Sequence, residues 1–175
     1  DIAEKVSPMM TEYSMYVSLN EPLFARVKAV HESGVALEQD QATLLDKTWK
    51  SFVRGGANLG AEDKATYSKL SEELSLLTLQ YGKNVLAATN AFTLNLTEEA
   101  DLEGLPEFVR EAAVETAKSK NMDGWAFDLS APSYGAFMKY STRRDLRQKM
   151  WMAYNTRATE GDNSNIELCR QIAEL

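Results

Sequence analysis

The sequence is poor in the residues that build cross-links, flexible linkers and membrane spans. Its 175 residues include one cysteine, so neither an intrachain disulfide nor a multi-cysteine zinc site can form. Four prolines and nine glycines exclude long flexible linkers and collagen-like tracts. No apolar run approaches the roughly 18 residues that a membrane-spanning helix needs, and no signal peptide is visible. We therefore expect a soluble globular chain with no membrane partner.

Basic residues are also too few for a nucleic-acid-binding surface. Nineteen lysines and arginines stand against 26 acidic residues, which gives a net charge of −7. A surface that follows phosphates needs a basic face, so we expect no nucleic-acid partner. The length suits one domain of ordinary size, or one lobe of a larger protein.

Histidine is the scarcest catalytic residue, because His31 is the only one. A helical zinc peptidase needs two histidines one turn apart with a glutamate between them, whereas His31-Glu32 is followed by Val35 at the second histidine position. We therefore expect His31 to be an exposed residue near a helix end. Cys169 lies on a predicted apolar face, where a packed core thiol is expected. We predict no catalytic, cofactor-binding or metal-binding residue in this chain.

What the sequence does contain is apolar residues at helical spacing along most of its length. The longest stretch runs over 62–92, with one continuous apolar stripe. Two short alternating segments, 93–97 and 125–129, predict strands that pair across the intervening helix. The predicted fold class is mainly α: a helical bundle with one long central helix and a small two-stranded β appendage. The other predicted helices occupy 2–16, 21–34, 44–55, 105–117, 142–161 and 166–175, and Pro132 is expected to open a short segment over 132–140.

Several helix boundaries and buried faces follow from local signals. Asn20 before Glu21 and Pro22 marks the start of the second helix. Ser141 or Thr142 is expected to cap the helix that carries Trp151, and that helix should end near Gly161. Either Asn163 or Asn165 is expected to cap the last helix. The helix after Pro106 is expected to bury Phe108, Val109, Ala112, Ala113 and Ala117.

Three polar or aromatic clusters have both a structural and a functional interpretation. The basic residues of 143–149 predict a solvated face, although they could hold the C-terminal carboxylate of a peptide. The acidic residues of 98–103 lack the order of a calcium loop and predict a solvated connection. The aromatic residues of 134–140 predict core packing, with a peptide groove as the alternative. These clusters are Arg143, Arg144, Arg147 and Lys149; Glu98, Glu99, Asp101 and Glu103; Tyr134, Phe137 and Tyr140.

Both ends of the sequence look severed. Helical spacing begins at Ile2 with no capping residue before it, and the last helical pattern reaches Leu175 with no terminating glycine, asparagine or proline. We therefore expect one helical lobe over 1–175, truncated at both ends.

Nearly the whole chain resembles, in order, the N-terminal region of the zinc oligopeptidases that include thimet oligopeptidase, oligopeptidase A and the bacterial peptidyl-dipeptidases. The most specific block runs from Tyr81 to Leu86 and from Ala88 to Phe92. At Gly60 relatives often have a serine helix cap, which glycine replaces at little cost. The other matching stretches are 19–27, 52–59, 62–64, 70–75, 102–106, 132–134, 146–157 and 162–163.

The resemblance implies a mainly helical metallopeptidase with two lobes beside a deep channel that admits unstructured short peptides. The zinc ligands and the glutamate base of that family lie in an H-E-x-x-H helix, with a further glutamate ligand, downstream of the matching region. The catalytic zinc domain is therefore expected to be absent from this chain, which would wall the channel and restrict substrate size without being active alone. The implied partners are the rest of its own polypeptide and short peptides, with zinc in the parent protein. The implied compartment is the bacterial cytoplasm or periplasm, with the cytoplasm preferred.

Two alternatives stay open. The chain could be a stand-alone helical module that binds a peptide or partner helix without catalysis, in a groove between the long helix and the Trp151 helix. It could also be part of a degenerate, non-catalytic relative of the family. Neither the peptide specificity nor the choice between dipeptide release and internal cleavage follows from the residues.

Overall fold

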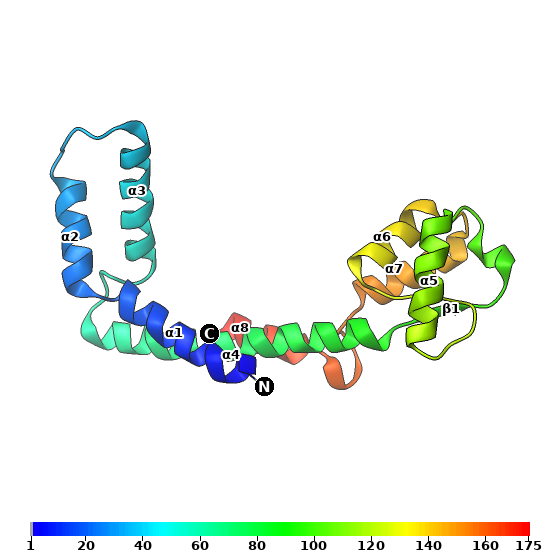
Figure 1. Ribbon diagram of the computed structural model, residues 1–175. Helices are drawn as coiled ribbons and strands as arrows, with labels where there is room; N and C mark the ends of the chain where they lie inside the picture. The colour runs from blue at the N-terminus through cyan, green and yellow to red at the C-terminus, as the bar shows by residue number, and fades with distance from the viewer. Residues whose placement is uncertain (1) are drawn as a thin grey trace. The chain divides into compact units, whose positions relative to one another are not determined.

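The computed structural model describes residues 2–175, which form eight α-helices, two short 3-10 helices and one two-stranded sheet (Figure 1). The predicted mainly α fold class with a small β appendage is confirmed. The chain divides into two compact units. The N-terminal unit comprises the residues up to Gln80 together with Gln171–Leu175, and the C-terminal unit comprises Tyr81–Arg170. No helix among the described residues is both long and apolar enough to cross a membrane.

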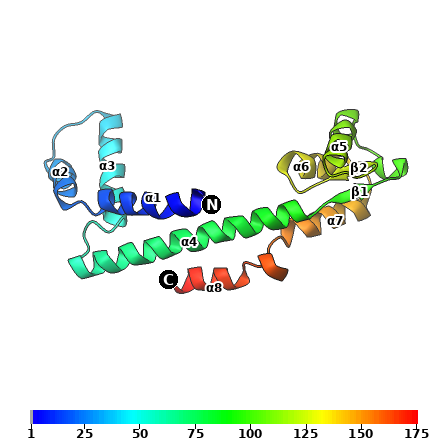
Figure 2. The same cartoon turned by 60° about the horizontal axis from the view of Figure 1, so that its bottom comes forward.

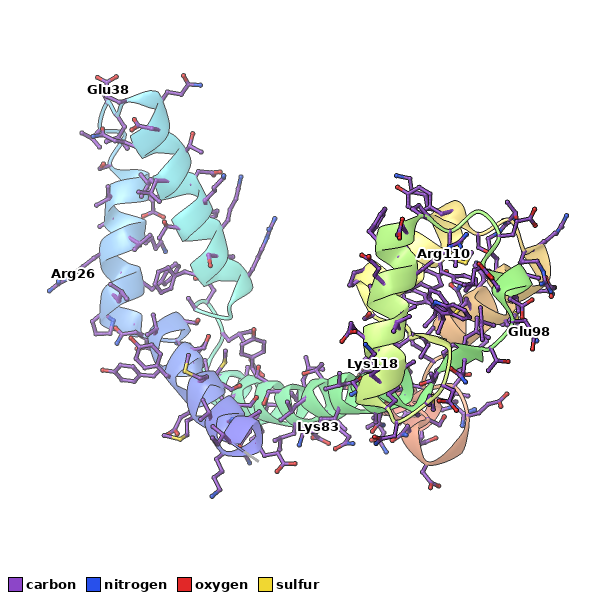
Figure 3. The ribbon with its side chains drawn as sticks, turned by 45° about the vertical axis from the view of Figure 1, so that its right-hand side comes forward. Arg26, Glu38, Lys83, Glu98, Arg110 and Lys118 are labelled. Atoms are coloured by element: carbon purple, nitrogen blue, oxygen red, sulfur yellow. The ribbon has the colours of Figure 1, made fainter. Side chains whose placement is uncertain are left out.

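The N-terminal unit is built around a helical hairpin of α2 (Glu21–Glu32) and α3 (Gln39–Arg54), preceded by α1 (Ile2–Ser18). The side chain of Asn20 accepts a hydrogen bond from the Leu23 N–H at 2.9 Å, so the predicted cap of α2 is confirmed. The rings of Phe24 on α2 and Phe52 on α3 lie 5.8 Å apart. Figure 3 shows Glu38 in the connection between the two helices, where it forms a capping box with Gln41.

Helix α4 (Ala61–Ala91) is the predicted long helix, and it contributes residues to both units (Figure 2). Its N-terminal end is tied to the start of α2, because the ammonium group of Lys64 donates to the Glu21 carboxylate at 2.8 Å. The residues of α4 from Tyr81 onward belong to the C-terminal unit.

The C-terminal unit contains the sheet, in which β1 (Leu94–Leu96) and β2 (Trp125–Phe127) pair antiparallel. The register places Leu94 opposite Phe127 and Leu96 opposite Trp125. Gly124 precedes β2 with a φ of 81°, and a Cβ at this position would overlap the carbonyl oxygen of Leu96. The predicted pairing of these two segments is confirmed.

Four helices surround this sheet or follow it along the chain: α5 (Glu107–Ser119), α6 (Ala131–Tyr140), α7 (Arg144–Asn155) and α8 (Ile166–Glu174). The two 3-10 helices are Glu99–Leu102 and Gly161–Asn163. Side chains of the sheet, α5, α6 and α7 form one core cluster, consisting of Leu96, Leu102, Leu105, Val109, Ala113, Phe127, Leu129, Phe137, Leu146 and Met150.

Two predictions about α7 are wrong. Arg143 is the N-cap residue and no side chain caps the helix, because the hydroxyl of Thr142 bonds to Glu103 instead. The Ser141 hydroxyl accepts a hydrogen bond from the Arg143 N–H, which lies before the helix. The helix ends at Asn155 rather than near Gly161, because the chain turns after it and Ala158 takes a φ of 55°.

Two further predictions fail for reasons of packing. Val109, Ala113 and Ala117 are buried on α5 as expected, but Phe108 and Ala112 are exposed because the core covers only one side of the helix. At the start of α8 the Asn165 side chain bonds to α4 and does not cap the helix. The Ser164 hydroxyl accepts from the Ile166 N–H instead, at 3.4 Å.

Candidate peptide-binding surfaces

His31 has a different environment from the exposed one predicted. It lies in the last turn of α2, half-buried, with its ring stacked on that of Trp49 from α3. The ring centroids are 4.4 Å apart and the planes differ by 7°. Over residues 2–175, no three histidine, cysteine, aspartate or glutamate side chains lie close enough together to hold a metal ion.

Cys169 is exposed, so the prediction of a packed core thiol is wrong. The apolar face of α8 that carries Cys169 also leaves Ile166 more than half exposed. On the same predicted face Ile172 is half-buried, so the face is only partly covered.

The four basic residues of 143–149 do not act as one group. Arg143 is half-buried and forms ion pairs with Asp101 and with Asp145, the latter at 2.9 Å. The hydrogen bond from Arg143 lowers the pKa of the Asp145 carboxyl below its ordinary value, and the two carboxylates raise the pKa of Arg143. Arg143 therefore holds the 3-10 helix Glu99–Leu102 against the start of α7, which is a structural role.

Of the predicted acidic connection, two residues have partners. Asp101 pairs with Arg143, and the Glu103 carboxylate accepts from the Thr142 hydroxyl at 2.9 Å. Both contacts fasten the segment after β1 to the start of α7. Glu98 and Glu99 are exposed, as the solvated-connection prediction requires.

The aromatic residues of α6 pack into the core, as predicted, and do not line a groove. Phe137 is fully buried against Phe127, with 4.7 Å between ring centroids. The ring of Tyr134 stacks on that of Tyr154, with 4.1 Å between the ring centroids. The guanidinium of Arg157 lies over the Tyr154 ring, 3.7 Å from its centroid. These contacts join α6 to α7.

Hollows on the surface offer better candidates for binding. In the N-terminal unit a hollow of about 770 Å³ lies between α1, the start of α2 and the first half of α4. Its apolar walls include Met9, Met15, Tyr16 and Leu19, and Lys69 and Glu72 add charge. In the C-terminal unit a smaller hollow of about 230 Å³ lies between α5 and α6, with Phe108 at its edge.

A third hollow, of about 510 Å³, lies between α6 and α7 in the C-terminal unit. Arg144 and Arg147 face it together with Trp151, which is 49% exposed. We call it the arginine–tryptophan surface; it is formed by Met138, Arg144, Arg147, Gln148 and Trp151. The sequence had indicated the arginines, but not that Trp151 lies beside them and outside the core.

Comparisons with known proteins find relatives for almost the whole chain. Oligopeptidase A of Escherichia coli is 33% identical over 159 residues, which cover 90% of this chain and 23% of the relative. Oligopeptidase A of Haemophilus influenzae is 34% identical over 155 residues, which cover 87% of this chain and 23% of the relative. Dipeptidyl carboxypeptidase of Escherichia coli is 30% identical over 176 residues, which cover 98% of this chain and 26% of the relative. No protein-family model matches the chain. The chain thus spans about a quarter of the length of these relatives.

Proposed function

We propose that this chain, a homologue of oligopeptidase A and dipeptidyl carboxypeptidase, is a non-catalytic lobe of a zinc oligopeptidase. The observation that carries the proposal is the homology itself, which runs through 90% of the chain but accounts for 23% of oligopeptidase A. Both relatives are peptidases by name. Three quarters of such a protein lie outside the part that this chain matches, and we assign the peptide-cleaving chemistry to that remainder.

The zinc ion of the parent would be held outside this chain. A catalytic zinc site uses three protein ligands, and the H-E-x-x-H arrangement supplies two of them as histidines. His31, the single histidine here, is stacked against Trp49, and the described residues contain no acidic or thiol cluster around it. These residues therefore do not fit a zinc site, and we assign no catalytic step to them.

The role proposed for the lobe is to wall the substrate channel and limit the size of peptides that enter. Support comes from the large apolar side chains of α1 that are exposed in the N-terminal unit. Tyr16, for example, is 70% exposed, and Ile2 is 79% exposed. An apolar helix face of this kind marks a contact with further protein. The partner we propose for it is the remainder of the same polypeptide, with short peptides as the substrates of the whole.

The test begins with the source gene. Reading it past the codon for Leu175 should reveal an H-E-x-x-H motif followed by a further glutamate. The protein expressed from the full frame should then cleave short unstructured peptides and leave folded proteins intact. A frame that ends shortly after Leu175, or a full-length product without that motif, would remove the peptidase assignment.

A second candidate function is a stand-alone helical module that binds peptides without cleaving them. The hollow of about 770 Å³ between α1, α2 and α4 favours it, because its walls combine methionines with a tyrosine and a few charged groups. Retention of peptides by the 175-residue chain, combined with a gene that encodes no metal-binding motif, would support this second function over the first.

A further inference from the structure

The arginine–tryptophan surface presents cationic and apolar groups side by side. Arg144, Arg147 and Trp151 are spaced by three and four residues on α7, which places them on one face of the helix. Met138 of α6 completes the apolar part of the lining. The lining contains no acidic residue, so its charge is not neutralised from within the hollow.

The two arginines keep hydrogen-bonding capacity that the fold does not use. Arg147 donates one N–H to the carbonyl oxygen of Ser141, which leaves its other donors available. The Arg144 side chain is exposed and forms no hydrogen bond or ion pair with another side chain or a backbone group among residues 2–175. Asp145, its neighbour, is engaged by Arg143 instead.

Helix stability does not explain the position of Arg144. It is the first residue of α7, and the N-terminal end of a helix carries a partial positive charge that disfavours a cation. At this helix end the Asp145 carboxylate already accepts hydrogen bonds from the backbone N–H groups of Asp145 and Leu146, so the attraction for an external anion comes from the guanidinium groups. The neighbouring indole and thioether offer contact area to an apolar group beside that anion.

We propose that the arginine–tryptophan surface binds an acidic side chain of a short peptide, with the following apolar side chain resting on Trp151 and Met138. That this peptide is a substrate of the parent enzyme rests on the function proposed above. An internal acidic side chain fits better than a terminal carboxylate. The hollow is open, so a peptide chain can continue past it on both sides and does not need to end there.

Binding can be measured by NMR on the ¹⁵N-labelled 175-residue chain, with the indole N–H signal of Trp151 as the probe. The two ligands are blocked tetrapeptides, acetyl-Ala-Glu-Leu-Ala-amide and the same peptide with glutamine in place of glutamate. The glutamate peptide should shift the Trp151 signal and bind about two- to fivefold more tightly than the glutamine peptide, as expected for an ion pair at a surface. The difference should shrink as salt is added.

Two variants with the same change in charge test the assignment to Arg144. Arg144→Gln should weaken the preference for the glutamate peptide, with Arg147 left to attract the carboxylate. Lys149→Gln removes a positive charge from an exposed position of the same helix outside the hollow, so it should keep the preference. Since neither side chain contributes to the core, both variants should retain the wild-type spectrum elsewhere.

Three results would overturn the inference: equal binding of the two peptides, equal effects of the two variants, or a Trp151 signal that does not move. A glutamine peptide with a free C-terminal carboxylate that binds in place of the glutamate peptide would also overturn it, in favour of terminus capture. The readout is binding and not hydrolysis. If the parent enzyme cleaves peptides but this surface does not bind carboxylates, only the present inference is refuted. Carboxylate binding by a chain whose gene lacks a zinc motif refutes only the proposed function.

Discussion

At the scale of single residues, one buried amide pair joins segments that are distant in sequence. The Nδ2 group of Asn84 on α4 donates to Oδ1 of Asn165 at 2.9 Å, and Nδ2 of Asn165 donates to the carbonyl oxygen of Tyr81 at 3.2 Å. Both side chains are buried. Each bond gives a buried polar group a partner, and without it the burial of that group would cost free energy. The pair therefore fixes the chain after α7 to the second half of α4.

Asn165→Ala should lower the free energy of unfolding by about 1–3 kcal/mol, because it leaves the buried amide of Asn84 without this acceptor. Urea denaturation followed by circular dichroism measures the change. Asn155→Ala is the matched control, since Asn155 is exposed and bonds only to the Trp151 carbonyl within its own helix. A loss no larger in Asn165→Ala than in Asn155→Ala would show that the buried pair does not stabilise this unit.

The ion pair between Glu21 and Lys64 predicts a pH dependence in the N-terminal unit. The hydrogen bond from Lys64, and then its charge, lower the pKa of Glu21 below its ordinary value of 4.5. A carboxyl whose pKa is depressed on folding stabilises the protein above its unfolded pKa, and this contribution is lost as the pH falls through the folded pKa. Acidification below about pH 4.5 should therefore weaken the unit.

Glu21→Gln removes the titrating group and should reduce the loss of stability between pH 6 and pH 3. Urea midpoints at the two pH values, read from the NMR signal of the Trp49 indole N–H, would show it. Glu32→Gln, an exposed carboxyl on the same helix, serves as the control. If both variants lose stability with acid as steeply as the unchanged chain, the Glu21–Lys64 pair has no such role.

At the scale of elements, regular spacing in the sequence was sufficient to predict both strands and every α-helix except α6, which it indicated only as a short segment after Pro132. The long helix over 62–92 is observed at Ala61–Ala91, and the Asn20 cap and the strand pairing are also observed. These features are local, because periodicity and capping depend on residues a few positions apart.

Apart from the cap and the end of α7, the failures concern what covers each face, which depends on residues distant in the sequence. Phe108 and Cys169 lie on helical faces with the expected spacing, yet both are exposed. The stacking of His31 on Trp49 and the position of Trp151 beside two arginines likewise follow from how helices pack against each other. No signal within a single helix specifies these contacts, so the arginine–tryptophan surface could be predicted only in its arginines.

The loop between the first 3-10 helix and α5 depends on a glycine. Gly104 has a φ of 85°, and a Cβ there would overlap the carbonyl oxygen of Tyr140. The loop is also held at this point by a hydrogen bond from the Thr142 N–H to the Glu103 carbonyl oxygen. Gly161, in the same unit, has a φ of 67°, and a Cβ added to it would meet no other atom within 4 Å.

Gly161→Ala should therefore cost about 1 kcal/mol for the backbone conformation alone. Gly104→Ala should cost about 1–3 kcal/mol more, because the 103–104 loop must also move away from the end of α6. Thermal or urea unfolding of the two variants measures the difference. Equal losses would mean that the contact between Gly104 and Tyr140 is not a constraint on this unit.

At the scale of the whole molecule, the two units differ in how much apolar surface they bury. In the N-terminal unit the buried apolar side chains among the described residues are Phe24 and Ala57, whereas the C-terminal unit has a core of ten residues centred on Phe127 and Phe137. Since burial of apolar side chains supplies most of the stability of a folded unit, we expect the N-terminal unit to be the less stable of the two.

Hydrogen exchange of the 175-residue chain should show this difference. The amides of α2 and α3 should exchange at least about tenfold faster than those of α5 and β2, because they open with a smaller free energy. The proposed function further predicts that the same amides become protected in the product of the complete gene. Equal protection of both units in the isolated chain would contradict the thin packing of the N-terminal unit.

The most direct measurement of the central claim compares the complete gene product with the 175-residue chain in one assay of zinc content and peptide hydrolysis. We expect the complete product to retain one zinc ion per chain after dialysis and to cleave short peptides until a chelator is added, whereas the 175-residue chain should retain no zinc and cleave nothing. Stoichiometric zinc or chelator-sensitive cleavage in the 175-residue chain, or neither of them in the complete product, would contradict it.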